Sequence, residues 1–272
     1  MILIRAGQMV SAWDQKAVAD GAVLISGEEI RAVGSFDALK KRCPEAEVIG
    51  SNRHLLIPGL INGHGHGHGL STFQRGALDN TMESWTYDTM KQKPLDTYDQ
   101  TCLAAAELLL SGVTTTMHNH HPLVVDHCTD YAKALSGYGD AGIRVQFNPG
   151  IIDPGIMVYG DTPGFLQGLP ENLRSILIQG PPEGMLTVEG FVAAVKDLYA
   201  TSDSGMTRIG FGPLGPYMVR DDLLMAVRSA ADALGAPIHI HGLQTILQKI
   251  YARNHLGKPM IRHLHDIGFL GK

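Results

Sequence analysis

The sequence lacks the features that would place the chain in a membrane or outside the cell. It has no apolar run long enough to form a membrane-spanning helix. Its first residues do not join a basic segment to a following apolar segment, as a secretory signal does. Cysteine is scarce, and Cys43, Cys102 and Cys128 are odd in number and too widely spaced for a disulfide framework or a zinc ribbon. We therefore predict a cytoplasmic protein with free thiols and no membrane partner.

Positive charge is also in short supply. The chain has 22 Lys plus Arg against 27 Asp plus Glu, which gives a net charge of −5. It shows no basic stripe, so nucleic acid is not an expected partner. With 44% apolar and 18% charged residues, the 272-residue chain is typical of a globular protein with a hydrophobic core. What the chain has in abundance is glycine, with 32 residues, and histidine, with 13.

The first fifty or so residues read as a small β unit. Short apolar or β-branched runs predict strands at 2–5, 22–26, 29–33 and 48–49, and a helix near 36–41. Gly27 and Glu28 predict a tight turn between the second and third of these strands. We therefore assign residues 1–56 to this unit and residues 57–272 to a second domain.

From residue 55 onward, strand-like runs alternate with helix-length segments. Strands are expected at 55–62, 113–117, 143–147, 208–211 and 237–241, and helices at 97–111, 126–138, 187–199, 221–234 and 260–267. Thr187 and Asp221 are expected N-caps, and Gly235 is an expected helix end. Five βα units predict a parallel sheet, either a (β/α)₈ barrel or an open doubly wound sheet. The Gly- and Pro-rich stretch 153–182 is expected to be a long loop that is functional or mobile.

The strongest functional signal is an apolar strand that runs into alternating histidine and glycine. Residues 58–68 read Pro-Gly-Leu-Ile-Asn-Gly-His-Gly-His-Gly-His. Side chains alternate between the faces of a strand, so His64 and His66 point the same way and could bind one metal ion. Active sites of (β/α)₈ barrels lie at the carboxyl ends of the strands. A Gly/His-rich surface loop is the alternative interpretation.

Two further histidine clusters follow later strands. In Pro-Ile-His-Ile-His at 237–241, His241 is nearest the strand's end and is the better ligand candidate. His239 lies one layer deeper, where it could fill the barrel and donate a hydrogen bond, and a purely structural role for both is the alternative. His118, His120 and His121 could contact a substrate or a metal, or could belong to a polar loop.

These motifs resemble the amidohydrolase superfamily, in its cytosine deaminase and atrazine chlorohydrolase-like branch. The first-strand motif is specific, and weaker matches follow in order at 75–76 with Trp85, 111–115, 212–217 and 239–245. The resemblance implies a metal-dependent hydrolase on a (β/α)₈ barrel, with a small β-sandwich formed from both chain ends. It also implies a small-molecule substrate and is compatible with a homodimer.

By position, the resemblance implies that His64, His66 and His241 hold one divalent metal ion. A single ion is expected, because 208–211 contains no lysine to bridge two metals. That ion is expected to be zinc, with iron as the alternative. The ion would lower the pKa of a bound water for attack on a non-peptide C–N bond of a small, heterocyclic molecule. Trp85 and Tyr217 lie in matching segments and are expected to contact the substrate.

Two positions depart from the pattern of the family. Where the branch usually carries Glu, three residues after the fifth-strand ligand, this chain has Gln244, and Leu214 stands where a His is usual. An amide can orient a substrate but cannot deliver a proton. We expect Gln244 in the catalytic set, Leu214 at the substrate, and His118, His120 or His121 in place of the missing acid. A dechlorinating hydrolase and a non-catalytic metal- or ligand-binding protein are the alternatives.

The length conflicts with a complete barrel. Four βα units separate Ile57 from Ile238, roughly 45 residues each, so eight units need about 360 residues where about 215 follow Ile57. The sequence therefore predicts only strands one to five. A C-terminally truncated fragment, completion by a second chain, and a naturally shortened binding protein are the three explanations. We expect weak or absent hydrolysis by these 272 residues alone, and exposed strand edges.

Overall fold

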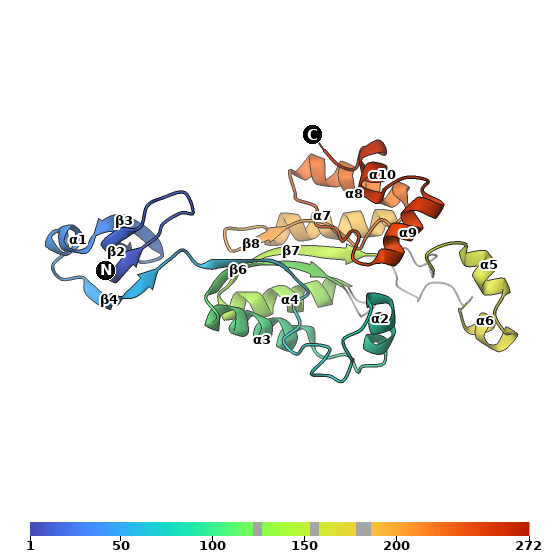
Figure 1. Ribbon diagram of the computed structural model, residues 1–272, viewed down its shortest axis with the longest axis horizontal. Coiled ribbons are helices and arrows are strands. Elements are labelled where there is room, and N and C mark those ends of the chain that lie inside the picture. Colours follow the sequence, from blue (N-terminus) through green and yellow to red (C-terminus); the bar gives the residue numbers. More distant parts are fainter. Residues whose placement is uncertain (122–126, 153–157, 178–185, 272) are drawn as a thin grey trace. The chain divides into compact units, whose positions relative to one another are not determined.

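The structure, a computed structural model, describes residues 1–121, 127–152, 158–177 and 186–271. The chain divides into two compact units, Met1–Leu60 and Ile61–Lys272. Each unit has its own sheet and its own buried core (Figure 1). Within the described ranges, no helix combines the length and the apolar character needed to cross a membrane.

The first unit is a four-stranded sheet with one helix. Its elements are β1 (Ile2–Met9), β2 (Val18–Ser26), β3 (Glu29–Ser35), α1 (Phe36–Arg42) and β4 (Glu47–Leu56). β1, β2 and β3 pair antiparallel in sequence order, and β4 pairs parallel to β1. Leu39 of α1 is buried against Leu3 and Leu24 of the sheet, which gives the unit a core of its own. Gly27 takes up a φ of +61° in the predicted turn.

The second unit is built on a parallel sheet. Its strands are β5 (Leu60–Gly65), β6 (Val113–His120), β7 (Arg144–Ile151), β8 (Thr207–Ile209) and β9 (Gly212–Pro213). The spatial order is β5-β6-β7-β8, and the short β9 also pairs with β7. β6, β8 and β9 each run parallel to β7, so their carboxyl ends lie at one edge of the sheet.

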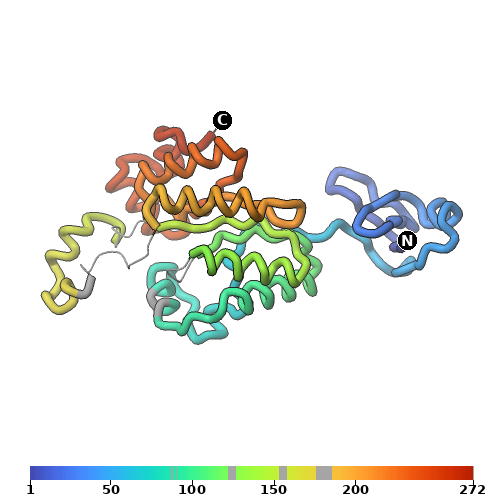
Figure 2. The backbone as a smooth tube through the Cα atoms, turned by 180° about the vertical axis from the view of Figure 1, so that it is seen from behind, coloured from blue at the N-terminus to red at the C-terminus, as the bar shows by residue number. Residues whose placement is uncertain are grey.

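Helices follow most of these strands. They are α2 (Met82–Met90), α3 (Thr97–Leu110), α4 (His127–Ala141), α5 (Thr162–Gln167), α6 (Glu171–Leu177), α7 (Val188–Ser202), α8 (Asp221–Leu234), α9 (Ile246–His255) and α10 (Met260–Asp266). Both backbone views show α3 beside α4, and α7 beside α8 (Figures 1 and 2). This is the expected incomplete (β/α)₈ barrel.

The core of the second unit lies between the sheet and its helices. Phe147 of β7 and Ile209 of β8 are fully buried with Phe191 of α7 and Leu224 of α8. Burying a side chain of this size stabilises the fold by about 1.5–3 kcal/mol. These contacts fix α7 and α8 against the strands that precede them.

Two predicted boundaries were wrong for local reasons. The expected strand at 55–62 is interrupted, because Pro58 lacks the N–H that a strand ladder needs, so β4 ends before it and β5 begins after it. Asp221 is the first residue of α8, and Arg220 is its N-cap. In the first turn of α8, the Asp221 carboxylate still interacts favourably with the positive end of the helix dipole. Gly235 ends α8 as predicted, with a φ of +64°.

The expected fifth strand is only an extended segment. A single bridge joins Ile238 to Phe211, and the backbone N–H of His239 donates to the Phe211 carbonyl at 2.8 Å. The N–H of His241 donates to the Leu214 carbonyl at 3.2 Å. The segment therefore keeps a parallel path along the sheet without forming a regular ladder.

The sequence reading missed four helices. α2 and α9 were not predicted, and α5 and α6 lie inside the stretch expected to be a loop. Residues 153–157 and 178–182 of that stretch, and residue 126 of a predicted helix, lie outside the described residues. All four helices are short, with six to ten residues each, and short helices are marginal without tertiary contacts. α2 and α9 contact each other through Met82 and Gln248, which are distant in the sequence.

Candidate metal centre

Three histidine side chains from distant parts of the chain meet in the second unit. His64 lies in β5, His66 follows the end of that strand, and His241 ends the extended segment beside Phe211. One ring nitrogen from each histidine lies within 4.8 Å of the others. The structure thus brings together the three residues that the sequence nominated as metal ligands.

Backbone carbonyls hold two of these rings. His66 Nδ1 lies 2.8 Å from the Asn119 carbonyl oxygen, and His241 Nδ1 lies 2.9 Å from the Leu214 carbonyl oxygen. A carbonyl oxygen can only accept, so Nδ1 carries the proton in both rings. Each Nε2 therefore keeps a lone pair free for a metal. Such outer partners fix the tautomer and the orientation of metal-binding histidines.

A fourth imidazole holds His64. Its Nδ1 lies 3.1 Å from His239 Nε2, and the two rings meet edge-on. Burial, with the neighbouring His64 and His241, lowers the pKa of His239 to about 4. His239 is therefore neutral near pH 7 and can accept from the Nδ1–H of His64, which again leaves Nε2 free. His239 Nδ1 is buried and has no hydrogen-bond partner among the described residues.

The donor set fits a borderline divalent ion such as zinc. Burial lowers the pKa of His66 to about 4, although its hydrogen bond to Asn119 acts in the opposite direction, and burial also lowers the pKa of His241. Both rings are thus neutral donors near pH 7. In a tetrahedral zinc site the ligand nitrogens are about 3.4 Å apart, and here the three nitrogens lie within 4.8 Å of one another. Among the described residues, no Asp, Glu or Cys joins the group.

The 118–121 cluster divides between two environments. His118 and His120 are 1% and 4% exposed and approach Tyr138, Tyr131 and Asp130 of α4. His121 follows the end of β6, and its ring centroid lies 4.8 Å from that of His66 and 5.8 Å from that of His241. Its Nε2 is buried without a partner in the described part of the chain. Of these three histidines, His121 is the one with a ring against the centre.

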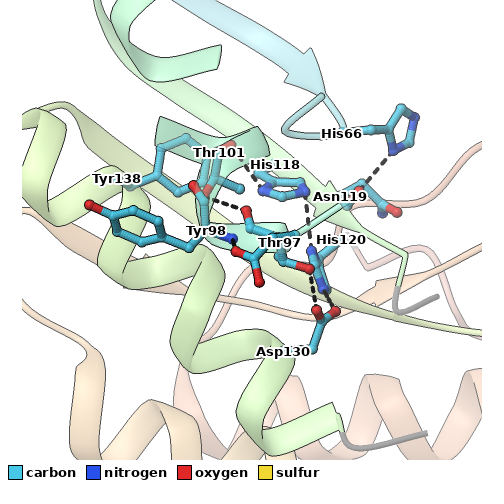
Figure 3. A network of polar contacts seen from close by, with 10 residues as sticks. His66, Thr97, Tyr98, Thr101, His118, Asn119, His120, Asp130 and Tyr138 are labelled. Atoms are coloured by element: carbon cyan, nitrogen blue, oxygen red, sulfur yellow. Dashed lines mark hydrogen bonds and ion pairs between the residues drawn. The ribbon is translucent and has the colours of Figure 1, made fainter. Parts of the chain in front are cut away.

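His118 and His120 belong to a buried hydrogen-bonded chain (Figure 3). His120 Nε2 lies 2.7 Å from an Asp130 carboxylate oxygen, and the Thr97 hydroxyl donates to the other oxygen. His118 Nε2 lies 3.3 Å from His120 Nδ1, and the Tyr138 hydroxyl lies 3.0 Å from His118 Nδ1. Burial acts to raise the pKa of Asp130, but the hydrogen bonds from His120 and Thr97 outweigh it and hold that pKa below its ordinary value.

Gln244 has its amide fixed from one side. Its Oε1 accepts from the Tyr217 hydroxyl at 2.7 Å and from Gln248 Nε2 at 3.4 Å. Tyr217 is 3% exposed and Gln248 is fully buried. The partner Gln248 went unnoticed in the sequence, because nothing in the pattern marks the first turn of α9 as part of a site.

Leu214 and Trp85, both expected at the substrate, lie in surroundings that differ from each other. The Leu214 side chain packs on the hydrophobic core, while its carbonyl holds His241. Trp85 in α2 donates from Nε1 to the Thr72 hydroxyl at 2.9 Å and lines a cavity of about 360 Å³ with Phe73 and Ala77.

Asp130 was not predicted from the sequence as part of a site, because a lone carboxylate on an amphipathic helix looks like an ordinary surface residue.

The sequence matches a known protein family and named relatives. The sequence pattern described as "Amidohydrolase family" matches residues 55–271. A 5-methylthioadenosine/S-adenosylhomocysteine deaminase of Symbiobacterium thermophilum is 27% identical over 259 residues, which is 92% of this chain and 51% of that protein. A protein of the same name from Saccharophagus degradans is 30% identical over 233 residues, 83% of this chain and 44% of its own.

Solved structures repeat the fold. An atrazine chlorohydrolase from Arthrobacter aurescens, complexed with zinc, has a TM-score of 0.75 and 23% identity, and the match covers 99% of this chain and 58% of that one. An adenosine deaminase from Xanthomonas campestris with bound zinc has a TM-score of 0.72 and 22% identity, with 99% and 55% covered. The chain spans about half the length of the curated relatives it matches.

Proposed function

The chain belongs to the amidohydrolase family, and on that premise we propose that it is a metal-dependent hydrolase of the deaminase or amidohydrolase type. The proposed reaction breaks a non-peptide carbon–nitrogen bond in a small heterocyclic molecule. Relatives named as deaminases of 5-methylthioadenosine, S-adenosylhomocysteine and 5'-deoxyadenosine support this substrate class. We also propose a cytoplasmic location, which the three free cysteines support.

The observation that carries this proposal is the convergence of three oriented imidazoles. His64, His66 and His241 would hold the ion through Nε2, and we propose zinc, with iron as the alternative. Solved relatives that contain zinc support this choice. A zinc ion supplies Lewis acidity, which lowers the pKa of a bound water. The chain's own contribution is to keep His66 and His241 neutral and to hold all three rings through Nδ1.

We propose that Gln244 orients the substrate as a hydrogen-bond donor. Its Oε1 is occupied by Tyr217 and Gln248, so its Nε2 is the end left for a ligand. An amide N–H recognises a ring nitrogen or a carbonyl oxygen but transfers no proton. His121, beside His66, is the proposed second polar contact to the substrate. Tyr217→Phe should raise KM while kcat changes little, because the amide loses its stronger anchor and not a reacting group.

A second candidate, hydrolytic dechlorination, is favoured by the same glutamine. An amine leaves from carbon only with a proton, whereas chloride leaves as an anion and needs none. Gln244 removes a proton donor from the position where the family usually has Glu, which suits the second leaving group better. A solved relative is named as an atrazine chlorohydrolase. A binding protein without turnover is the remaining outcome.

The test is a comparison of ammonia and chloride release by the zinc-loaded chain. The panel contains 5-methylthioadenosine, S-adenosylhomocysteine, 5'-deoxyadenosine, adenosine and atrazine, assayed near stoichiometric enzyme concentration so that slow turnover is detected. We expect slow ammonia release, in line with the weak hydrolysis expected of these 272 residues, and its disappearance in His66→Ala. His263→Leu is the control, because that imidazole pairs with Asp221. Chloride release alone would select dechlorination. Bound zinc with neither product would overturn a hydrolytic activity of these residues and favour the binding protein.

A further inference from the structure

No step proposed above uses the hydrogen-bonded network of Tyr138, His118, His120 and Asp130. All four side chains are at most 5% exposed. Figure 3 shows them between β6 and α4, with His66 on the opposite side of Asn119. Buried polar groups are costly unless they are paired, and here every ring nitrogen of His118 and His120 has a partner.

Asp130 anchors this hydrogen-bonded network at one end. A carboxylate oxygen accepts, so His120 Nε2 donates to Asp130 at 2.7 Å. His120 Nδ1 lies 3.3 Å from His118 Nε2, and the Tyr138 hydroxyl lies 3.0 Å from His118 Nδ1. The network thus connects both imidazole rings to Asp130 and Tyr138 of α4 and anchors their side chains there.

The anchored end of β6 contacts residues 66–67, the metal-ligand loop that follows β5, in two places. Asn119, between the two histidines in sequence, supplies the carbonyl that holds His66 Nδ1 at 2.8 Å. The ring of His118 lies against Gly67, the residue after His66. A Cβ on Gly67 would lie 2.5 Å from His118 Cε1 and 3.0 Å from each ring nitrogen. Gly67 also has a φ of +67°, which L side chains rarely adopt.

We propose that His118, anchored through His120 and Asp130, is a positioning residue for the metal ligand His66. The anchored ring limits where the backbone at Gly67 can lie, and the anchored strand end fixes the Asn119 carbonyl that orients the His66 ring. The role follows from placement, because both nitrogens of His118 are occupied within the network. The proposal rests on the proposed metal centre and adds an outer support to it.

The test is a double-mutant cycle on zinc affinity, measured by competition with a chromophoric chelator. Gly67→Ala should weaken zinc binding at least tenfold, because the new methyl group pushes the loop off the His118 ring. Gly76→Ala is the matched control, since Gly76 has a φ of +94° with nothing within 4 Å of the added Cβ. It carries the same kind of backbone strain without the clash, and zinc affinity should stay within about twofold of the parent chain.

The decisive arm adds His118→Ala to both Gly67 backgrounds. If the His118 ring determines where the backbone at Gly67 lies, His118→Ala alone should weaken zinc binding. Gly67→Ala should then reduce zinc affinity clearly less in the His118→Ala background, so the two effects are not additive. Additive effects within about twofold would overturn the proposal while leaving the metal centre intact. Failure of the parent chain to bind zinc would instead overturn the proposed function.

A measurement on the metal-free chain tests the positioning role independently of zinc binding. Asp130→Asn keeps the size of the side chain and removes the carboxylate charge to which His120 Nε2 is hydrogen-bonded. Nitrogen-15 spectra of the imidazoles in the metal-free chain should then show a changed His66 Nδ1 signal, because the Asn119 carbonyl moves with the loosened strand end. An unchanged His66 signal together with changed His118 and His120 signals would overturn the proposal.

Discussion

His239 gives the sharpest test of how the centre is organised. It is the one side chain among the three outer partners, so it can be changed without touching the backbone. His239→Leu removes the acceptor of the 3.1 Å hydrogen bond from His64 Nδ1 and leaves the ligand set itself intact. His239→Gln restores an acceptor oxygen near the same position. Zinc affinity should therefore fall in the first variant and recover in the second.

The size of the effect follows from the exposure of His64. Losing an outer partner typically weakens metal binding 10- to 100-fold. His64 is exposed, so water can replace the lost acceptor, and the loss should lie near the lower limit. We expect about a tenfold weaker Kd in His239→Leu, which corresponds to about 1.4 kcal/mol.

The assay is the same chelator competition, run at pH 7.5 on chains shown by circular dichroism to be folded. His263→Leu is the control, because that imidazole pairs with Asp221 away from the centre. Its zinc affinity should match the parent chain. The reasoning is refuted if His239→Leu binds zinc as tightly as the parent, or if His239→Gln is as weak as His239→Leu.

Three further predictions follow from the same contacts. His66→Ala should weaken zinc binding by more than about a hundredfold in the competition assay, since a ligand is lost outright, and a smaller loss would remove His66 from the set. The metal-free chain should lose thermal stability as the pH falls from about 6.5 to 4. The pKa values of His66 and His239 are about 4 in the folded state and near 6.5 in the unfolded state, so the unfolded state binds more protons in this pH range. A melting temperature that does not change with pH in calorimetry would contradict this. Phe147→Ala should lower the free energy of unfolding by about 3–5 kcal/mol in urea, and a change below about 1 kcal/mol would show that the core is misassigned.

Local signals made the long helices predictable from the sequence. α7 begins after Thr187, whose hydroxyl accepts from the Gly190 N–H at 3.1 Å, and α8 ends at Gly235 in the left-handed conformation. Caps and a 3.6-residue period act within one element, so the sequence carries them openly. α9 also has a local cap, since the Thr245 hydroxyl accepts from the Gln248 N–H at 3.4 Å, but the helix has only ten residues, and its buried Gln248 contacts Met82 of α2 far away in the sequence.

The convergence of the three histidines was predictable for a similar reason, and the groups that hold their rings were not. Alternation along a strand places His64 and His66 on one side, and the exit of a later segment adds His241. The carbonyls of Asn119 and Leu214 leave no trace in the sequence, because every residue has a carbonyl. The direction of His120 toward Asp130 depends on how β6 packs on α4, which only the tertiary structure decides.

The most direct test of the account is the metal complement and ligand set of the chain. The protein is stripped with a chelator, titrated with Zn²⁺, and examined by X-ray absorption at the zinc edge. The account predicts one zinc per chain, with three imidazole nitrogens at about 2.0–2.1 Å, and loss of that signal in the triple variant of His64, His66 and His241 to Ala. A chain that binds no zinc, or whose zinc keeps its imidazole ligands in the triple variant, would contradict it.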